Sequence, residues 1–281
     1  GANHAGEIKL LAEIARPAFG LITNIGTAHL EGFGSFENIV KAKGELYDYI
    51  RNTRDGKIFI DHDNPVLAAI SDGLTKIEYG RQSSGLFVTG QTLSNGPFLS
   101  FTWQSSRNRH IVHTKLIGDY NLSNALAAIT VGKYFGISSA LACKALEEYM
   151  PSNNRSQLKE TARNRLIIDA YNANPTSMLA ALTNFENMKA PSKALILGDM
   201  LELGKNSLSE HQKIIDFVED NHFEHTFLVG ENFCRTENHY FRFHDTDELV
   251  RYLSGNEPLS GNTILIKGSR GVGLEKCIDY L

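Results

Sequence analysis

A lysine in the first third of the chain occupies a position where a charge is unexpected. Residues 36–50 carry apolar side chains at helical spacing, and Lys43 fills the gap in that stripe. It follows Phe36 by seven residues and precedes Tyr47 by four, so the three share one face of the predicted helix. A buried ammonium must be paired, modified or extended to solvent, because leaving it bare costs free energy. Spacing alone favours a stem packed on the core and a head that reaches water.

His29 is the second residue in a position suited to chemistry. It ends the segment 24–29, directly after a predicted strand, where α/β enzymes often place catalytic groups. A neutral imidazole is a competent ligand for a divalent metal ion. Position alone still favours an ordinary surface or hydrogen-bonded histidine.

Further polar residues are predicted at the ends of strands or at the start of a helix. Asn121 and Asn124 are one helical turn apart, so they share a face. The candidates at strand ends are Asp169, Asp199, Glu202, Lys267, Ser269 and Arg270. Each group could bind a ligand, or could only fix loops and satisfy backbone amides.

The elements that must position these residues follow two patterns, and the first ends near residue 151. Helical spacing is found at 4–15, 35–50, 122–135 and 138–149, and strand-like runs at 19–25, 57–60, 87–93, 98–103 and 111–117. Ser35 and Ser138 are predicted N-caps. The segment 151–154 is the best candidate for a domain boundary.

After this segment, strands alternate regularly with helices. Strand-like runs at 166–170, 194–198, 226–230 and 263–267 are followed by helical patterns at 177–188, 209–221, 246–254 and 272–281. This alternation predicts a largely parallel, doubly wound α/β sheet, whose ligands gather at the carboxyl ends of the strands. The segments expected there are 169–174, 198–203 and 268–270. No phosphate loop of the GxxxxGKS or GxxxxGKT kind occurs in the sequence.

Length and composition set further limits. The 281 residues suffice for two domains, and 42% hydrophobic with 21% charged residues is the balance of a soluble globular protein. A net charge of −4 argues against nucleic acid, and no apolar run approaches the ~20 residues of a membrane helix. Cys143, Cys234 and Cys277 are widely spaced, so we expect reduced, mostly buried thiols in a cytoplasmic protein. The start at Gly1, without methionine and within a predicted loop, indicates a fragment.

Several long motifs closely resemble, in order along the chain, those of the Mur ligase family. The first is TNIGTAHLEGFGS at 23–35, continued by AKGE at 42–45. The others are GDYNLSNALAA at 118–128, DAYNANP at 169–175, GDMLELG at 198–204 and KGSR at 267–270. The resemblance covers nearly the whole chain, and the ordered set is far more specific than any single motif.

This resemblance implies a fold of two α/β domains. Residues 1–152 would form the C-terminal part of a central, ATP-binding domain of ATPase type with a mixed sheet. Residues 153–281 would form a Rossmann-like, doubly wound C-terminal domain that binds the incoming amino acid or dipeptide. The family's phosphate loop and a metal-binding glutamate would lie upstream of Gly1.

The resemblance also implies an activity. Within the family the motifs look most like those of the enzyme that adds D-alanyl-D-alanine to UDP-N-acetylmuramoyl-tripeptide. We therefore expect an ATP-dependent amide-bond ligase that acts through an acyl phosphate in peptidoglycan precursor synthesis, as a cytoplasmic monomer without nucleic-acid or membrane partners. The alternatives are another ligase of the superfamily, adding an amino acid or resembling folylpolyglutamate synthase, or a catalytically incomplete binding fragment. The motifs at 169–175 and 198–204 argue against the other ligases.

Residue roles follow from the same resemblance. His29 and a Lys43 carbamylated by CO₂ would bind Mg²⁺, and Arg155 would reach the ATP phosphates, which makes these three the catalytic candidates. ATP would also contact Asn121, Asn124, Asp169, Tyr171, Asn172 and Asn174. The muramoyl peptide and the dipeptide would contact Asn3, His4, Asp199, Glu202, Lys267, Ser269 and Arg270. His211 could face the same site or the surface.

Overall fold

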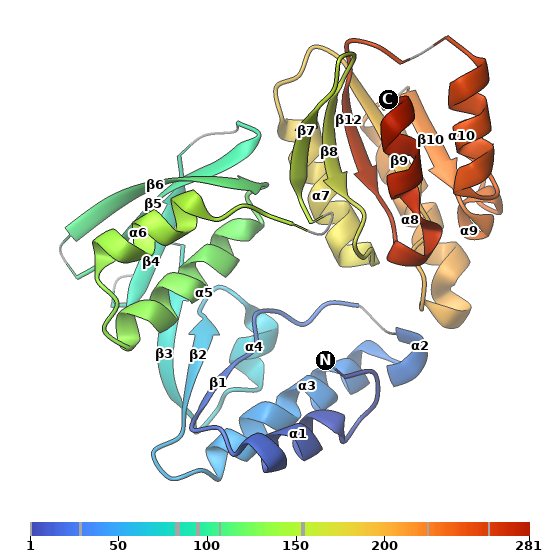
Figure 1. The fold of residues 1–281 in the computed structure, drawn as a ribbon. Coiled ribbons are helices and arrows are strands. Elements are labelled where there is room, and N and C mark those ends of the chain that lie inside the picture. Colours follow the sequence, from blue (N-terminus) through green and yellow to red (C-terminus); the bar gives the residue numbers. More distant parts are fainter. Residues whose placement is uncertain are drawn as a thin grey trace. The chain divides into compact units, whose positions relative to one another are not determined.

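The computed structural model contains two compact units (Figure 1). The structure describes residues 2–27, 30–81, 85–93, 96–106, 108–152, 155–223, 225–257 and 259–281. The first unit comprises Gly1–Lys115 and Asp119–Tyr149, and the second comprises Leu116–Gly118 and Met150–Leu281. Each unit has its own sheet and its own core, and each is described by itself.

The first unit is built on a mixed six-stranded sheet in the order β1-β2-β3-β4-β5-β6. The strands are β1 (Phe19–Leu21), β2 (Lys57–Asp61), β3 (Thr75–Gly80), β4 (Val88–Thr92), β5 (Phe98–Ser105) and β6 (Asn108–Ile117). The pairings from β1 to β4 are parallel, and β4 pairs with β5 antiparallel. The mixed α/β sheet expected for this part of the chain is confirmed.

Helices of the first unit begin largely where the sequence predicts. They are α1 (Glu7–Ala15), α2 (Leu30–Phe33), α3 (Phe36–Arg51), α4 (Pro65–Ala69), α5 (Asn121–Tyr134) and α6 (Ser139–Glu148). The Ser35 hydroxyl accepts a hydrogen bond from a backbone amide at the start of α3, and Ser138 does the same for α6, so both predicted caps are confirmed. The predicted apolar stripe of α3 packs into the core through Ile39, Tyr47 and Ile50.

Helix α1 begins three residues later than expected and is capped from another helix. Gly6, at its N-cap, has a φ of 88° and no side chain that could cap. Glu45 of α3 supplies the missing acceptors, since its Oε1 lies 2.6 Å from the Gly6 amide and its Oε2 2.9 Å from the Lys9 amide. The carboxylate thus satisfies the start of α1 and ties it to α3.

Replacing Glu45 with alanine should loosen α1, because the two amides lose their acceptor. We expect a loss of about 1–2 kcal/mol of stability, typical of a lost N-cap. Hydrogen exchange at Gly6 and Lys9 should accelerate, whereas Glu13→Ala, an exposed change on the same helix, should leave it unchanged. Equal exchange in both variants would show that Glu45 does not cap this helix.

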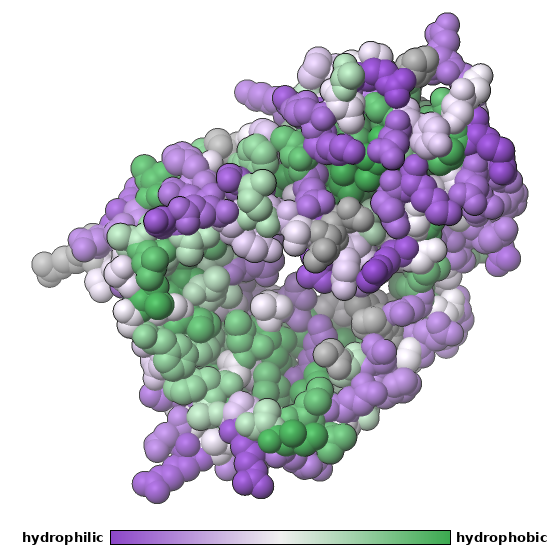
Figure 2. Space-filling view, viewed as in Figure 1, coloured by the Kyte–Doolittle hydropathy of each residue, from purple (hydrophilic) through white to green (hydrophobic). Residues whose placement is uncertain are grey.

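Much of the apolar face of α1 stays exposed. Within the described residues of this helix only Ala12 is buried, while Leu10, Leu11 and Ile14 are 57%, 49% and 71% exposed. Figure 2, viewed as Figure 1 is, shows apolar surface gathered over this helix. The contact with α3 therefore accounts for only part of the apolar surface of α1.

The second unit is a six-stranded sheet in the order β11-β10-β9-β12-β8-β7. Its strands are β7 (Gln157–Glu160), β8 (Arg165–Asp169), β9 (Lys193–Gly198), β10 (His225–Val229), β11 (Phe241–Phe243) and β12 (Thr263–Lys267). All pairings are parallel except that of β7 with β8. The helices are α7 (Pro175–Asn187), α8 (Ser207–Asp220), α9 (Glu231–Cys234) and α10 (Thr246–Gly255). The predicted doubly wound sheet is confirmed.

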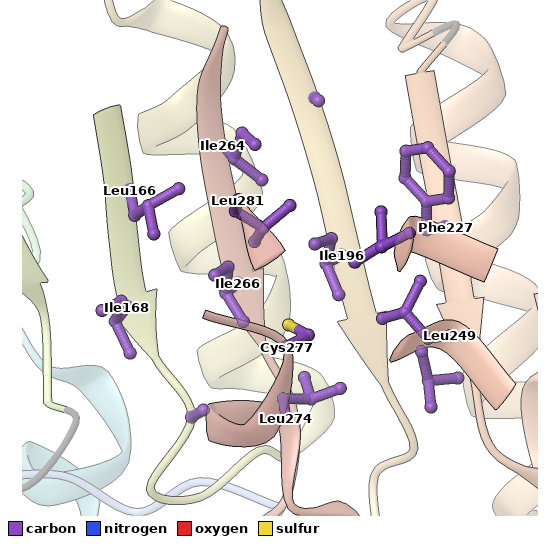
Figure 3. Close-up of a cluster of buried hydrophobic side chains, with 14 of the residues drawn as sticks. Leu166, Ile168, Ile196, Phe227, Leu249, Ile264, Ile266, Leu274, Cys277 and Leu281 are labelled. Atoms are coloured by element: carbon purple, nitrogen blue, oxygen red, sulfur yellow. The ribbon is translucent and has the colours of Figure 1, made fainter. Parts of the chain in front are cut away.

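Apolar side chains on one face of this sheet form a buried cluster (Figure 3). Alternate residues of four neighbouring strands point to this face, including Leu166, Ile168, Ile264, Ile266, Ile196 and Phe227. Leu249 of α10 and the C-terminal residues Leu274, Cys277 and Leu281 cover them. Strand β12 is buried along its whole length, as a parallel strand covered on both faces must be.

Some local expectations were wrong. The predicted helix at 272–281 is instead two short 3₁₀ segments, Arg270–Val272 and Leu274–Tyr280, because Gly273 between them has a φ of 72°. Burial is confirmed for Cys277, where it raises the thiol pKa to about 12, whereas Cys143 and Cys234 are partly exposed. Among the described helices none is long and apolar enough to cross a membrane.

Candidate functional site

Lys43 is a partly buried amine that faces the loop after β1. Its Nζ donates to the Asn24 carbonyl at 3.2 Å. No carboxylate in the described part of the chain pairs with it, and burial lowers the pKa of Lys43 because the charged form loses hydration. The neutral amine is therefore more accessible here than on a solvent-exposed lysine. Only the neutral form can attack CO₂, so this environment suits carbamylation.

The segment that contains Asn3 and His4 lies against α2, close in sequence to His29. His29 itself lies outside the described residues, so its side chain is not placed. A Cβ added at Gly32 of α2 would come within 2.5 Å of the Asn3 carbonyl oxygen. The amides of Asn3 and His4 donate to the Glu7 carboxylate at 2.7 and 3.2 Å, and these bonds lower the Glu7 pKa. Asn3 is thus held beside α2, and His4 is held by Glu7.

The predicted asparagine pair is joined by a hydrogen bond at the start of α5. Nδ2 of Asn124 donates to Oδ1 of Asn121 at 3.1 Å, which confirms that the two share a face. Between them, the Ser123 hydroxyl donates to the carboxylate of Asp61 at the end of β2. Asp61 is buried and also accepts from the Asp63 amide at 3.0 Å. Asp61 therefore fixes this helix start, a role the sequence analysis missed although its position at a strand end was a signal.

A buried ion pair joins the carboxyl ends of two neighbouring strands in the second unit. Nζ of Lys267 lies 2.5 Å from Oδ2 of Asp169, and the two residues are partners in the register of β12 and β8. Their side chains are 2% and 16% exposed. Nζ also approaches the Asn172 carbonyl at 3.4 Å, and the Ser156 amide donates to Oδ1 of Asp169 at 3.3 Å. These contacts hold the predicted nucleotide turn against β12.

Ser269 connects three of the loops at these strand ends. Its amide donates to the Asp199 carbonyl at 3.0 Å, and its hydroxyl accepts from the Leu201 amide at 3.0 Å. The same hydroxyl approaches the Ala173 carbonyl at 3.4 Å, and the side chain is buried. The motifs at 169–175, 198–204 and 267–270 are therefore brought together at one edge of the sheet.

The carboxylate of Asp199 is occupied by the loop that follows β10. It accepts from the Asn232 amide and side chain at 2.9 and 2.8 Å, and from the Phe233 amide at 3.0 Å. A Cβ at Gly230, whose φ is 126°, would lie 2.2 Å from Cγ of Asp199, so the loop requires glycine there. Asp199 therefore fixes loops, which is one of the two roles that its position at a strand end allows.

His211 is fully buried and neutral. Its Nε2 accepts from the Met200 amide at 3.0 Å, and its Nδ1–H donates to the Ser207 carbonyl at 2.7 Å. The contact of Nε2 with Asp199 at 3.6 Å is therefore not an ion pair, because that nitrogen carries no proton. Burial lowers the pKa of His211 below its ordinary value of 6.5. The histidine supports the loop after β9 instead of reaching the surface.

This neutral histidine predicts a pH dependence of stability. Below about pH 6.5 the unfolded chain binds a proton at His211 that the folded chain does not, so stability falls as the pH falls toward the lowered folded pKa. In His211→Gln the loss of stability on acidification should be smaller than in the wild type. The exposed change His244→Gln is the control. Identical slopes for His211→Gln and the wild type between about pH 7.5 and 5.5 would contradict a neutral native His211.

The remaining predicted residues lie on the same loops. The guanidinium carbon of Arg155 is 3.9 Å from the ring centroid of Tyr171, and that of Arg270 is 5.8 Å from it. Asn174 caps α7 through a capping box with Ser177. The Asn172 side chain accepts from the next amide, and Glu202 is exposed with a φ of 65°. Arg155 and Arg270, both close to the ring of Tyr171, thus supply the cationic groups described at this edge.

Comparison with known proteins relates both units to one family. The description "Mur ligase middle domain" matches residues 1–132, and "Mur ligase, glutamate ligase domain" matches residues 154–270. The UDP-N-acetylmuramoyl-tripeptide–D-alanyl-D-alanine ligase of Bacillus subtilis is 31% identical over 100% of this chain and 63% of its own length. The ligase of the same name from Rickettsia prowazekii is 30% identical, again over 100% of this chain and 64% of its own length.

Solved structures give the same relationship. A crystal structure of MurF from Acinetobacter baumannii matches with a TM-score of 0.85 at 27% identity, over 99% of this chain and 62% of that one. MurF of Thermotoga maritima in complex with ADP matches in fold with a TM-score of 0.84 at 20% identity, over 99% of this chain and 65% of that one. The chain spans less than two thirds of the length of these relatives.

Proposed function

This chain belongs to the Mur ligase family, and on that premise we propose that it acts in the ATP-dependent addition of D-alanyl-D-alanine to UDP-N-acetylmuramoyl-tripeptide. The observation that carries the proposal is the 31% identity, over the whole chain, to a ligase of that name. The first unit would be part of the ATP-binding domain, and the second would bind the dipeptide. The protein would work as a cytoplasmic monomer in peptidoglycan precursor synthesis.

The nucleotide would use both asparagines of α5 and the turn after β8. The pair Asn121 and Asn124, joined by a hydrogen bond, would contact adenine or ribose. The nucleotide would also contact the carboxylate of Asp169, whose position is fixed by Lys267. Tyr171, Asn172 and Asn174 lie on the same turn. The ADP in the Thermotoga maritima relative supports ATP as the nucleotide of this family.

Mg²⁺ would be held by His29 and by a carbamate on Lys43. Carbamylation requires a neutral amine. The amine of Lys43 fits this requirement, because it is partly buried, pairs with no carboxylate of the described residues and has a lowered pKa. A carbamate would supply the oxygen atoms that Mg²⁺ prefers. When bound, Mg²⁺ would offset the repulsion between the substrate carboxylate and the triphosphate.

The proposed reaction has two steps. A carboxylate oxygen of the tripeptide attacks the γ-phosphorus of ATP, which gives an acyl phosphate and ADP. The amine of D-alanyl-D-alanine then attacks the acyl carbon, and the tetrahedral intermediate expels phosphate. Arg155 would stabilise the charge on the transferred phosphoryl group. Asn3 and His4 would contact the muramoyl peptide, and Asp199, Glu202, Lys267, Ser269 and Arg270 would shape the dipeptide site.

A panel of amines tests the substrate assignment. The intact protein should join D-alanyl-D-alanine to UDP-N-acetylmuramoyl-tripeptide in the presence of ATP and Mg²⁺, as seen by the mass of the product. Meso-diaminopimelate, lysine and glutamate, offered with the acceptors that their ligases use, should give no product. Preference for any of these amines would replace the proposed function with that of another member of the family.

A further inference from the structure

Two arginines from distant parts of the second unit converge on one aromatic ring. Arg155 precedes β7, Tyr171 follows β8 and Arg270 follows β12. Because β7 runs antiparallel to β8 and next to it, the start of β7 lies beside the carboxyl end of β8, whose other neighbour is the parallel strand β12. The sheet topology therefore brings all three side chains to the same edge.

The geometry around the ring is that of a cation–π contact. The guanidinium carbon of Arg155 lies 3.9 Å from the ring centroid of Tyr171, close enough for the plane of the cation to rest on the ring. Arg270 approaches the same ring to 5.8 Å. Both arginines are exposed, and in the part of the chain that the structure describes neither guanidinium makes a hydrogen bond or an ion pair.

Arg155 and Arg270 both lack an anionic partner among the described residues. Guanidinium groups gathered around one ring repel each other, and contact with the ring offsets only part of that repulsion. Their N–H groups remain available to an anion, and arginine presents these donors in a planar fork that suits phosphate oxygens. The ring stands on a turn that is itself fixed, since Lys267 reaches the Asn172 carbonyl and Asn174 caps α7.

We propose that Tyr171 is a positioning residue, whose ring holds Arg155 ready to bind the phosphate oxygens of ATP. In this view Tyr171 acts through Arg155 and not by its hydroxyl group. The inference rests on the proposed function for the identity of the anion. The aromatic ring limits the directions in which a long, exposed arginine can point, so less conformational entropy is lost when the phosphates bind.

Two substitutions of Tyr171 separate the ring from the hydroxyl. Tyr171→Phe keeps the ring and should retain most of the kcat/KM for ATP that Tyr171→Leu loses. Tyr171→Leu removes the ring and should lower it about 3- to 30-fold, the range expected for a cation–π contact. KM for D-alanyl-D-alanine should change less than KM for ATP. Tyr171 is only half-buried, so both variants should fold, and thermal denaturation would check this.

Changes of Arg155 complete the test. Arg155→Lys keeps the charge but loses the planar stack, so it should resemble Tyr171→Leu. In an Arg155→Met background, Tyr171→Leu should have little further effect, because the ring acts through the arginine. A loss of activity in Tyr171→Phe equal to that in Tyr171→Leu, or additive effects of the two changes, would overturn the inference.

Calorimetry keeps this test separate from that of the proposed function. The affinity of the intact protein for ATP with Mg²⁺ should fall further in Tyr171→Leu than in Tyr171→Phe. That difference would support the positioning role even if the wild type used a different amine. Equal ATP affinity and equal kcat/KM in the wild type and both variants would overturn the positioning role and leave the ligase assignment intact.

Discussion

Replacing Lys43 with methionine should lower the rate of ligation by a factor on the order of a hundred to a thousand. Methionine matches the length and apolar stem of lysine, so packing on α3 is kept, but no carbamate can form. The loss should fall mainly on kcat, because the proposed ligand stabilises charge that develops during phosphoryl transfer. Steady-state kinetics with saturating ATP and tripeptide would measure it.

Lys41→Met is the matched control for this change. Lys41 lies on the same helix, two residues away, but is exposed, so its removal should leave the rate unchanged. Because burial lowers the pKa of Lys43, its amine becomes neutral at a lower pH than in the unfolded chain and should take up ¹³C-labelled CO₂ at a lower pH. A carbamate signal in the Lys41→Met variant but not in Lys43→Met would assign it. Full activity of Lys43→Met would contradict the proposed metal site.

Replacing Lys267 with alanine should destabilise the second unit by about 3 kcal/mol or more. The change leaves the mostly buried carboxylate of Asp169 without its partner, and removing one member of a buried ion pair is more harmful than removing both. Chemical denaturation, followed by a signal from the second unit, would measure the loss. The double variant Lys267→Met with Asp169→Leu should recover part of it.

The pair of Lys159 and Asp279 is the control for this prediction. It lies on the surface of the same unit, with the charged atoms 3.9 Å apart and side chains 49% and 89% exposed. Lys159→Ala should therefore change stability by less than about 1 kcal/mol. Equal losses of stability from Lys159→Ala and Lys267→Ala would show that burial does not increase the cost of breaking the pair of Lys267 and Asp169.

The fold was predictable where local spacing and burial point the same way. The stripe of α3 and its Ser35 cap are local features, and the apolar runs of β8, β9, β10 and β12 mark buried parallel strands. Strands β3, β7 and β11 were not predicted. Two of them, β7 and β11, have only four and three residues, and much of each is exposed, so neither shows an apolar run.

The candidate site was predictable as a set of loops but not as a set of contacts. Lys267 and Asp169 are 98 residues apart in sequence, and only the register of β8 with β12 makes them partners. His211 gave no sign of its burial, because its partners are backbone groups of Met200 and Ser207. Asp61 was overlooked for a similar reason, since its role depends on packing against α5.

The ligase assignment predicts that phosphate release depends on all three substrates. The intact protein should release phosphate from ATP only when both UDP-N-acetylmuramoyl-tripeptide and D-alanyl-D-alanine are present, and omission of either should reduce the rate to background. Release that is unaffected by omitting D-alanyl-D-alanine, or no release with all three substrates and Mg²⁺ present, would contradict the assignment.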